Sequence, residues 1–321
     1  MRTRPWPGAT TVVVGVIGDP VEHSLSPALH NAALRELGLD WAYVAFHVPA
    51  GRAKEAVAAM ADLGIRGLSV TMPHKAAAAA ACQRLTPVAA RLGAVNTVTL
   101  SNGELSGDST DGAGFIDSLA DRGWLADGKR CLVLGAGGAA RAVVLALAEA
   151  GAARVGVVAR QPEQALDVSS LAGSAGVVGS VEAVEESDLV VNATPVGMRA
   201  GHGGAGPDER QSLPFELDPS WLGPGQLVAD LIYAPATTPL LAVARARGAD
   251  TRSGLGMLIH QAARQLTIWT GRAAPIGVMS AAALRELGKQ AEPATLGELA
   301  QVSEPTEPSG SAGGAAGPAN A

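Results

Sequence analysis

The stretch CLVLGAGGAARAVVLAL, residues 131–147, says most about how this chain folds. Its first half is an apolar run typical of a buried strand, and its second half has the apolar spacing of a helix. Between the two halves, Gly135, Gly137 and Ala140 form the pattern G-x-G-x-x-A. In this context the pattern predicts a dinucleotide-binding loop, because the glycines allow a tight turn and close backbone approach to a pyrophosphate, and the alanine allows close helix–strand packing. The alternative is a glycine-rich turn that binds no ligand.

The strand that follows indicates which dinucleotide fits. Sites for NAD usually place an acidic residue at the end of this second strand, where it binds the ribose hydroxyls. Here the strand at residues 154–159 leads into Arg160 and Gln161, and no acid is present. An arginine at this position can bind a 2′-phosphate and stack on adenine, so the sequence favours NADP. A solvated surface arginine is the alternative interpretation.

Apolar runs and helical patterns alternate on both sides of this loop. In the first hundred residues, strands are predicted at 12–17, 42–48, 67–71 and 94–100, and helices at 28–37, 51–63 and 76–84. A second unit follows, with strands at 130–134, 154–159, 189–193 and 227–232, and helices at 113–122, 138–150 and 255–270. This alternation predicts the α/β class, with mostly parallel sheets covered by helices on both faces.

Size and composition exclude several classes of protein. The 321 residues suggest two domains, and 47% hydrophobic residues are enough for a large core. The net charge of −6 argues against nucleic acid as the partner, and no apolar stretch is suited to crossing a membrane. Cys82 and Cys131, the only cysteines, suggest neither a disulfide framework nor a metal cluster, which fits a cytoplasmic protein. Residues 200–212 are predicted to form a mobile glycine-rich loop, and residues 290–321 a disordered tail.

The segment GDPVEHSLSPALHN, residues 18–31, places two hydroxyl groups at a strand-to-helix turn. Ser26 followed by Pro27 is an ordinary helix start, in which the serine caps free backbone N–H groups and the proline occupies the first helical position. That interpretation does not explain Ser24. Two hydroxyls at the positive end of a helix also form a small anion site suited to a carboxylate. The local sequence leaves both interpretations open.

Further polar groups lie near the strand ends of the first unit. Thr71 and Lys75 follow one strand, Asn96 lies on the next, and Asp111 lies at the junction with the second unit. Strand-end loops of a parallel sheet meet at one edge, where ligands bind, so these groups are expected to converge with the two serines. Taken singly, Asn96 could be a turn residue, Lys75 a surface charge and Asp111 the cap of helix 113–122.

Eight stretches, in order between residues 13 and 285, carry a family resemblance. They read GDPVEHSLSPALHN, GLSVTMPHK, GAVNTV, GDSTDG, LGAGGAAR, NATPVGM, DLIYAPATTPLL and GLGMLIHQA. Together they resemble the shikimate dehydrogenase family. The resemblance implies a mostly parallel N-terminal α/β substrate domain, a Rossmann-type NADP-binding domain, and C-terminal helices that return to the first domain. The substrate domain would comprise residues 11–112 and 255–288, and the NADP-binding domain residues 113–254.

The resemblance also implies a role for each matching residue. Lys75 and Asp111 match the catalytic pair, a lysine that supplies a proton and an aspartate that holds it and favours its charged form. Substrate contacts are implied for Ser24 and Ser26 at a carboxylate and for Thr71, Asn96 and Gln261 at ring hydroxyls, with Tyr233 nearby. Cofactor contacts are implied for Gly135, Ala136, Gly137, Gly138, Ala139, Arg160, Thr194, Gly254 and Met257, and no metal ion is implied.

The implied activity is the reversible NADPH-dependent reduction of 3-dehydroshikimate to shikimate, in chorismate and aromatic amino-acid biosynthesis, by a cytoplasmic monomer or homodimer. Alternatives are a quinate or aminoshikimate dehydrogenase using NAD or NADP, a non-catalytic NADP-binding protein, and another enzyme on a related fold, such as a methylene-tetrahydrofolate dehydrogenase. The chain departs from the family pattern at Ser69, His74 and Ser109. At residues 159–161 it has Ala-Arg-Gln where Asn-Arg-Thr is usual, so the hold on a 2′-phosphate is expected to be weak and some use of NAD follows.

Overall fold

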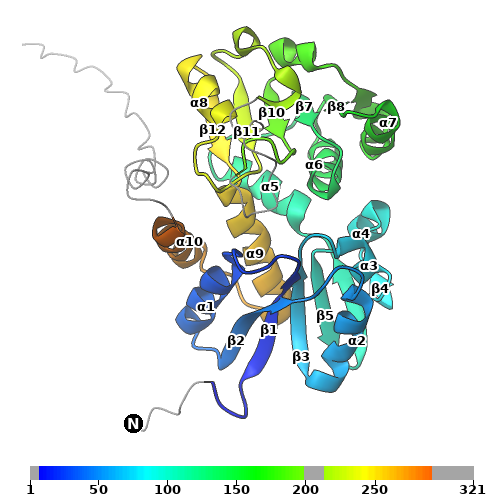
Figure 1. Ribbon diagram of the computed structural model, residues 1–321, viewed down its shortest axis with the longest axis vertical. Helices are drawn as coiled ribbons and strands as arrows, with labels where there is room; N and C mark the ends of the chain where they lie inside the picture. The colour runs from blue at the N-terminus through cyan, green and yellow to red at the C-terminus, as the bar shows by residue number, and fades with distance from the viewer. Residues whose placement is uncertain (1–6, 199–212, 291–321) are drawn as a thin grey trace, which may run out of the picture.

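Two six-stranded sheets, each flanked by helices, make up the computed structural model, which describes residues 7–198 and 213–290 (Figure 1). The predicted α/β architecture is confirmed. The mobile loop predicted at 200–212 and the tail predicted at 290–321 lie outside the described residues, apart from Gln290 at the end of the last helix. No helix in the described ranges is both long and apolar enough to cross a membrane.

The N-terminal sheet has the strand order β2-β1-β3-β5-β6-β4. Its strands are β1 (Val12–Gly18), β2 (Trp41–His47), β3 (Ile65–Val70), β4 (Arg84–Leu85), β5 (Thr97–Ser101) and β6 (Glu104–Asp108). As predicted, β1 pairs in parallel with β2 and β3, but β5 runs antiparallel to β3 and β6. The prediction missed β6. Asn102 and Gly103, both with positive φ, turn the chain between β5 and β6, and an Asn-Gly pair between two strands is a hairpin signal that the sequence contains.

The second sheet is parallel throughout, with the strand order β12-β11-β10-β7-β8-β9. Its strands are β7 (Arg130–Leu134), β8 (Arg154–Val158), β9 (Gly176–Val178), β10 (Leu189–Asn192), β11 (Leu227–Asp230) and β12 (Asp250–Ser253). This is the strand order of a Rossmann fold, with the sequence-predicted loop at the end of its first strand. The central strands are apolar along their length because helices cover both faces of the sheet.

Helices flank both sheets and also join them (Figure 1). Around the first sheet lie α1 (Ser26–Glu36), α2 (Ala53–Leu63), α3 (Lys75–Ala79) and α4 (Pro87–Leu92). Around the second lie α6 (Gly138–Glu149), α7 (Pro162–Ser170) and α8 (Pro239–Ala246). Between the sheets, α5 (Asp111–Ala120) packs against α6 on one side and α9 (Leu255–Thr270) on the other. A Cβ at Gly114 would lie 2.5 Å from the backbone nitrogen of Gln261, so only glycine lets α5 and α9 approach this closely.

The C-terminal helices return to the first sheet, as predicted. Helix α10 (Ile276–Gln290) packs on α1, and Met279 shares one apolar core with Leu29 of α1 and Leu266 of α9. Helix α9 therefore connects the second sheet, through β12, to the core of the first. The domain limits at residues 112 and 254 stay predictions.

Candidate active site

A cavity of about 390 Å³ is lined by residues from both sheets and from α9. All eight residues expected to act in catalysis or substrate binding line it: Ser24, Ser26, Thr71, Lys75, Asn96, Asp111, Tyr233 and Gln261. Of the expected cofactor residues, Ala139, Gly254 and Met257 also line it, whereas Gly135, Ala136, Gly137, Gly138, Arg160 and Thr194 do not. The cavity thus lies next to the glycine loop but does not include it.

Strand direction explains why distant residues meet here. The parallel strands β1 and β3 end at the same edge, which brings the loop with Ser24 next to Thr71. Because β5 runs antiparallel to β3, Asn96 comes to this edge from the beginning of its strand rather than from the end. Because β6 runs antiparallel to β5, Asp111 follows its C-terminal end at the same edge. The predicted convergence is therefore observed, but for Asn96 the hairpin causes it.

Lys75 and Asp111 form an ion pair in this cavity. The Lys75 Nζ lies 2.5 Å from the Asp111 Oδ2, and the two side chains are 23% and 11% exposed. Each is the first residue of a helix, Lys75 of α3 and Asp111 of α5. The interpretations of Lys75 as a surface charge and of Asp111 as a helix cap are therefore wrong. Thr110 holds the N-cap position of α5, and no side-chain cap is made there.

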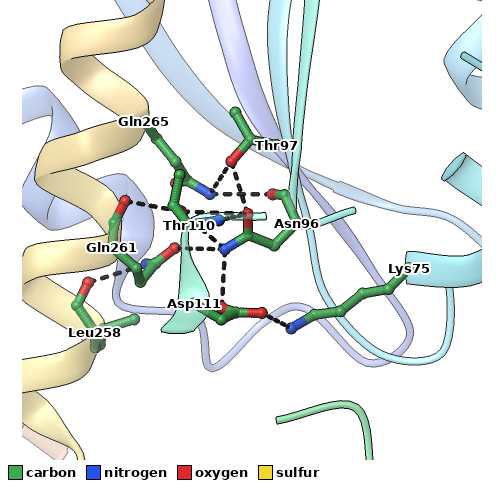
Figure 2. A network of polar contacts seen from close by, with 8 residues as sticks. All are labelled: Lys75, Asn96, Thr97, Thr110, Asp111, Leu258, Gln261 and Gln265. Atoms are coloured by element: carbon green, nitrogen blue, oxygen red, sulfur yellow. Dashed lines mark hydrogen bonds and ion pairs between the residues drawn. The ribbon is translucent and has the colours of Figure 1, made fainter. Parts of the chain in front are cut away.

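Asn96 lies at the centre of a buried polar network (Figure 2). Its Oδ1 accepts hydrogen bonds from the Thr97 Oγ1 at 2.7 Å and the Thr110 backbone N–H at 2.8 Å. Its Nδ2 lies 3.0 Å from the Thr110 Oγ1, 2.8 Å from the Asp111 Oδ1 and 3.2 Å from the Gln261 Oε1. The amide has two hydrogens for these three acceptors. The three acceptors therefore compete for these hydrogens, and two of them, the Asp111 Oδ1 and the Gln261 Oε1, belong to residues that line the cavity.

The serine turn differs from the predicted helix start. Helix α1 has Leu25 at its N-cap position, with no side-chain cap, so the expected capping role of Ser26 is wrong. The Ser26 side chain is instead buried and faces the cavity, because Ser26 is already the first residue of α1. It is the Ser24 Oγ that accepts a hydrogen bond from the Ser26 backbone N–H, at 3.3 Å. Both hydroxyls line the cavity.

A chain of hydrogen bonds through Tyr43, Ser69 and Gln265 supports this network; Ser69 and Gln265 also line the cavity, and their role was not predicted from the sequence. The Tyr43 hydroxyl donates to the Ser69 Oγ at 2.7 Å, and the Ser69 Oγ donates to the Gln265 Oε1 at 2.7 Å. The Gln265 Nε2 then donates to the Asn96 carbonyl at 3.0 Å. Gln265 follows Gln261 by one helical turn, which is the signal that could have identified it.

His30 and His74 lie buried beside the cavity without lining it. His30 stacks on Tyr43, with ring centroids 4.2 Å apart. Burial lowers the pKa of His30 to about 3, and a contact with the Gln265 side chain opposes this shift only in part. His30 is therefore neutral at physiological pH. The His74 Nε2 lies 2.7 Å from the Val48 carbonyl, which fixes the turn before Lys75.

The glycine loop between β7 and α6 has the form of a pyrophosphate cradle. Gly135 has φ +117°, and a Cβ there would lie 3.0 Å from the Ala193 backbone, with Thr194 beside it. A Cβ at Gly137 or Gly138 would meet nothing within 4 Å, so the N-terminus of α6 faces open space. No side chain caps that terminus. Its free N–H groups and the positive end of the helix dipole fit a bound diphosphate.

Arg160 lies just beyond β8 and is exposed. It has no hydrogen bond or ion pair with any residue in the described ranges. Its guanidinium is therefore available to bind a phosphate group. NADP carries such a group on its ribose, so this residue fits NADP.

Comparisons with known proteins show the family to which the chain belongs. Residues 16–98 match the family described as "Shikimate dehydrogenase substrate binding domain", and residues 254–284 match "Shikimate 5'-dehydrogenase C-terminal domain". Residues 130–201 match "NADP oxidoreductase coenzyme F420-dependent". The shikimate dehydrogenase (NADP(+)) of Moorella thermoacetica is 44% identical over 281 residues, which cover 84% of this chain and 92% of that protein. The chain belongs to the shikimate dehydrogenase family.

Solved structures of shikimate dehydrogenases and their relatives share the fold. The shikimate 5-dehydrogenase of Thermus thermophilus, in complex with NADP(H) and shikimate, has a TM-score of 0.77 and 37% identity, covering 86% of this chain and 100% of that one. The quinate dehydrogenase of Corynebacterium glutamicum, in complex with NAD, has a TM-score of 0.75 and 30% identity, covering 86% of this chain and 99% of that one. The fold alone therefore does not distinguish these two substrates.

Proposed function

We propose that the chain catalyses the reversible NADP-dependent reduction of 3-dehydroshikimate to shikimate, with Lys75 and Asp111 as the catalytic pair. The observation that carries this proposal is the position of that pair. The Lys75 Nζ and the Asp111 Oδ2 lie 2.5 Å apart, in a cavity that Ala139 of the first turn of α6 and Met257 of α9 also line. A proton donor and the expected nicotinamide position therefore face the same small space. The agreement of the relatives' names supports the same reaction.

Substrate binding follows from the other polar groups of the cavity. In the proposal, the Ser24 and Ser26 hydroxyls donate to the substrate carboxylate. Thr71, Asn96 and Gln261 contact the ring hydroxyls, and Tyr233 closes the cavity on the side of the second sheet. These groups fix which ring carbon faces the nicotinamide, and orientation of this kind lowers the barrier of the chemical step.

Lys75 acts on the carbonyl oxygen in the reduction. NADPH, when bound, supplies a hydride to C3 of the substrate. Negative charge then develops on the C3 oxygen, and the Lys75 ammonium stabilises it through a hydrogen bond and transfers a proton to it. Asp111 holds Lys75 through one carboxylate oxygen, while the Asn96 amide holds the other oxygen at 2.8 Å. The carboxylate is thus fixed at both ends, which keeps the lysine aimed at the reacting atom.

The cofactor side of the proposal rests on Arg160 and the glycine loop. Gly135, Ala136, Gly137, Gly138 and Ala139 would hold the pyrophosphate, with Thr194 beside them. Arg160 would bind the 2′-phosphate of NADP. Its neighbours Gln161 and Glu163 supply no second positive charge, so discrimination against NAD is expected to be modest.

The test is to follow nicotinamide absorbance with the purified protein, shikimate or quinate, and NADP or NAD. The proposal expects fastest turnover with shikimate and NADP. Faster turnover with quinate or NAD would leave the assignment of the catalytic pair in place but change the proposed substrate or cofactor. No turnover with any combination, although NADP binds, would refute the catalytic proposal. The proposal also places the enzyme in the cytoplasm as a monomer or homodimer, which light scattering distinguishes.

A further inference from the structure

A second cavity, of about 450 Å³, lies on the side of α9 that faces away from the active site. On α9 the active-site cavity is lined by Met257, Leu258, Gln261 and Gln265, and the second cavity by Leu255, Gly256, Ile259 and His260. With 3.6 residues per turn, these two sets occupy opposite faces of the helix. The second cavity is therefore separate from the catalytic one, and none of the residues assigned above to catalysis, substrate or cofactor lines it.

The lining of this second cavity is basic. Arg245 of α8, Arg252 of β12 and Arg122 just after α5 contribute three guanidinium groups, against one carboxylate, that of Asp121. That carboxylate lies 3.8 Å from the His260 Nε2. With the histidine neutral, the lining has a formal charge of +2, although the chain as a whole has a net charge of −6. A local concentration of positive charge on an acidic protein attracts anions.

Two of these arginines are held by neutral groups rather than by carboxylates. The Arg245 Nε donates to the Thr251 Oγ1 at 2.7 Å, and the Arg252 Nη1 donates to the Thr251 carbonyl at 2.8 Å. The Arg252 Nε is buried and has no hydrogen-bond partner in the part of the chain that the structure describes. Burial, and then the nearby charge of Arg122, lower the pKa of Arg252, and the charge of Asp250 opposes this shift only in part. Elsewhere, arginines such as Arg141 and Arg264 form direct ion pairs with aspartates.

We propose that this cavity binds a small polyvalent oxyanion, a molecule with two or more phosphate or carboxylate groups. The planar guanidinium groups match the geometry of such groups, and an anion would supply the hydrogen-bonded negative partner that Arg245 and Arg252 lack in the described part of the chain. Ser253 and Ser280 line the same space and can provide further donors, whereas the Ser118 hydroxyl already donates to the Phe115 carbonyl at 2.6 Å. The volume lies within the usual range for small-molecule sites. More than one anionic group is expected because the arginines come from different elements of the fold.

The experiment is isothermal titration of the full chain with citrate and, separately, with inorganic pyrophosphate, at constant ionic strength set with sodium chloride. Saturating NADPH and shikimate first occupy the active site, where the serine pair and the glycine loop are the other candidate anion sites. Arg252→Gln and Arg245→Gln remove one guanidinium each. Arg154→Gln is the matched control, because Arg154 is an exposed arginine at the start of β8 and does not line the cavity.

The proposal expects at least one probe to bind with a stoichiometry of one, and each cavity variant to weaken binding by about tenfold or more while the control does not. Saturation of neither probe at millimolar concentration would overturn it, as would equal affinity in wild type and both cavity variants, or an equal loss in the control. Melting curves establish that the variants are folded. Should Arg252→Gln fail to fold, Arg245→Gln decides the question, because Arg245 is exposed.

Discussion

The two halves of the proposed active site differ in how they would recognise their ligands. On the substrate side, the functional groups are side chains in one hydrogen-bonded network, and Asn96, Asp111 and Gln261 are all buried. On the cofactor side, Gly137 and Gly138 expose their backbone, and Arg160 is exposed without a partner in the described ranges. A small polyhydroxylated acid requires polar groups held in fixed positions, whereas a diphosphate is held by backbone N–H groups at a helix terminus. Substitutions in the first half should therefore change catalysis and stability together, and those in the second should change the binding of one ligand.

The largest effect is expected at Lys75. Lys75→Ala removes the proposed proton donor, so kcat should fall about 10²- to 10⁴-fold, the usual contribution of a positioned general acid. The melting temperature should also fall, because the largely buried Asp111 carboxylate loses its charged partner, but it should fall less than after Asn96→Ala, because the lysine side chain is 23% exposed. Steady-state kinetics with shikimate and NADP measure this change. Lys54→Ala, on the exposed face of α2, is the control and should keep wild-type kcat. A normal kcat in Lys75→Ala would rule out the proton-transfer role.

Asn96 should couple activity to stability. Asn96→Ala leaves the Asp111 Oδ1 and the Thr110 backbone N–H without their buried partner. Each such group costs about 1–3 kcal/mol of unfolding free energy. At the same time Asp111 loses the contact that orients it, so kcat should fall as well. Urea unfolding and steady-state kinetics on the same preparation measure both. Loss of activity at unchanged stability would mean that the hydrogen bonds of Asn96 do not stabilise the folded protein.

Acid should lower the free energy of unfolding through His30, which lies beside the substrate side of the cavity. Burial lowers the pKa of His30 from 6.5 to about 3, so below pH 6.5 the unfolded chain takes up a proton that the folded chain does not. The free energy of unfolding should then fall, as the pH falls, by up to about 1.4 kcal/mol per pH unit between these two values. His30→Phe keeps a ring against Tyr43 and removes this proton. Urea unfolding at near-neutral and mildly acidic pH should show a smaller acid loss in the variant. Equal losses would place the acid sensitivity in other groups.

Sequence separation explains which parts of the active site could be predicted from the sequence and which could not. Lys75 and Asp111 lie in short motifs near strand ends, where the resemblance to the family implied their roles, and the limits of β7 match the apolar run at 130–134. The support behind them was not predictable in this way, because Tyr43–Ser69 and Ser69–Gln265 join residues 26 and 196 positions apart. No local pattern encodes such pairs. The cap assigned to Ser26 was wrong for a related reason. A local rule assigned its hydroxyl to the helix end, whereas tertiary packing directs it into the cavity.

The smallest effect is expected at Arg160. This substitution tests whether cofactor binding can change while catalysis and stability do not. Arg160→Ala should raise KM for NADP by about tenfold and leave kcat unchanged, because a charge-assisted hydrogen bond to phosphate contributes about 1.5–3 kcal/mol and exposure to water reduces that value. KM for NAD, which has no 2′-phosphate, should not change. The NADP effect should shrink as salt is added, since exposed charges are screened.

Arg154→Ala is the control for this last prediction, because Arg154 is an exposed arginine at the other end of the same strand, β8. If Arg160→Ala raises KM for both cofactors equally, then Arg160 contacts a part that they share, and the NADP preference must come from another residue. If KM changes for NADP alone while stability and kcat stay at wild-type values, one half of this active site can be altered separately from the other. The buried network around Asn96 does not allow such a change, because there each side chain supports the next.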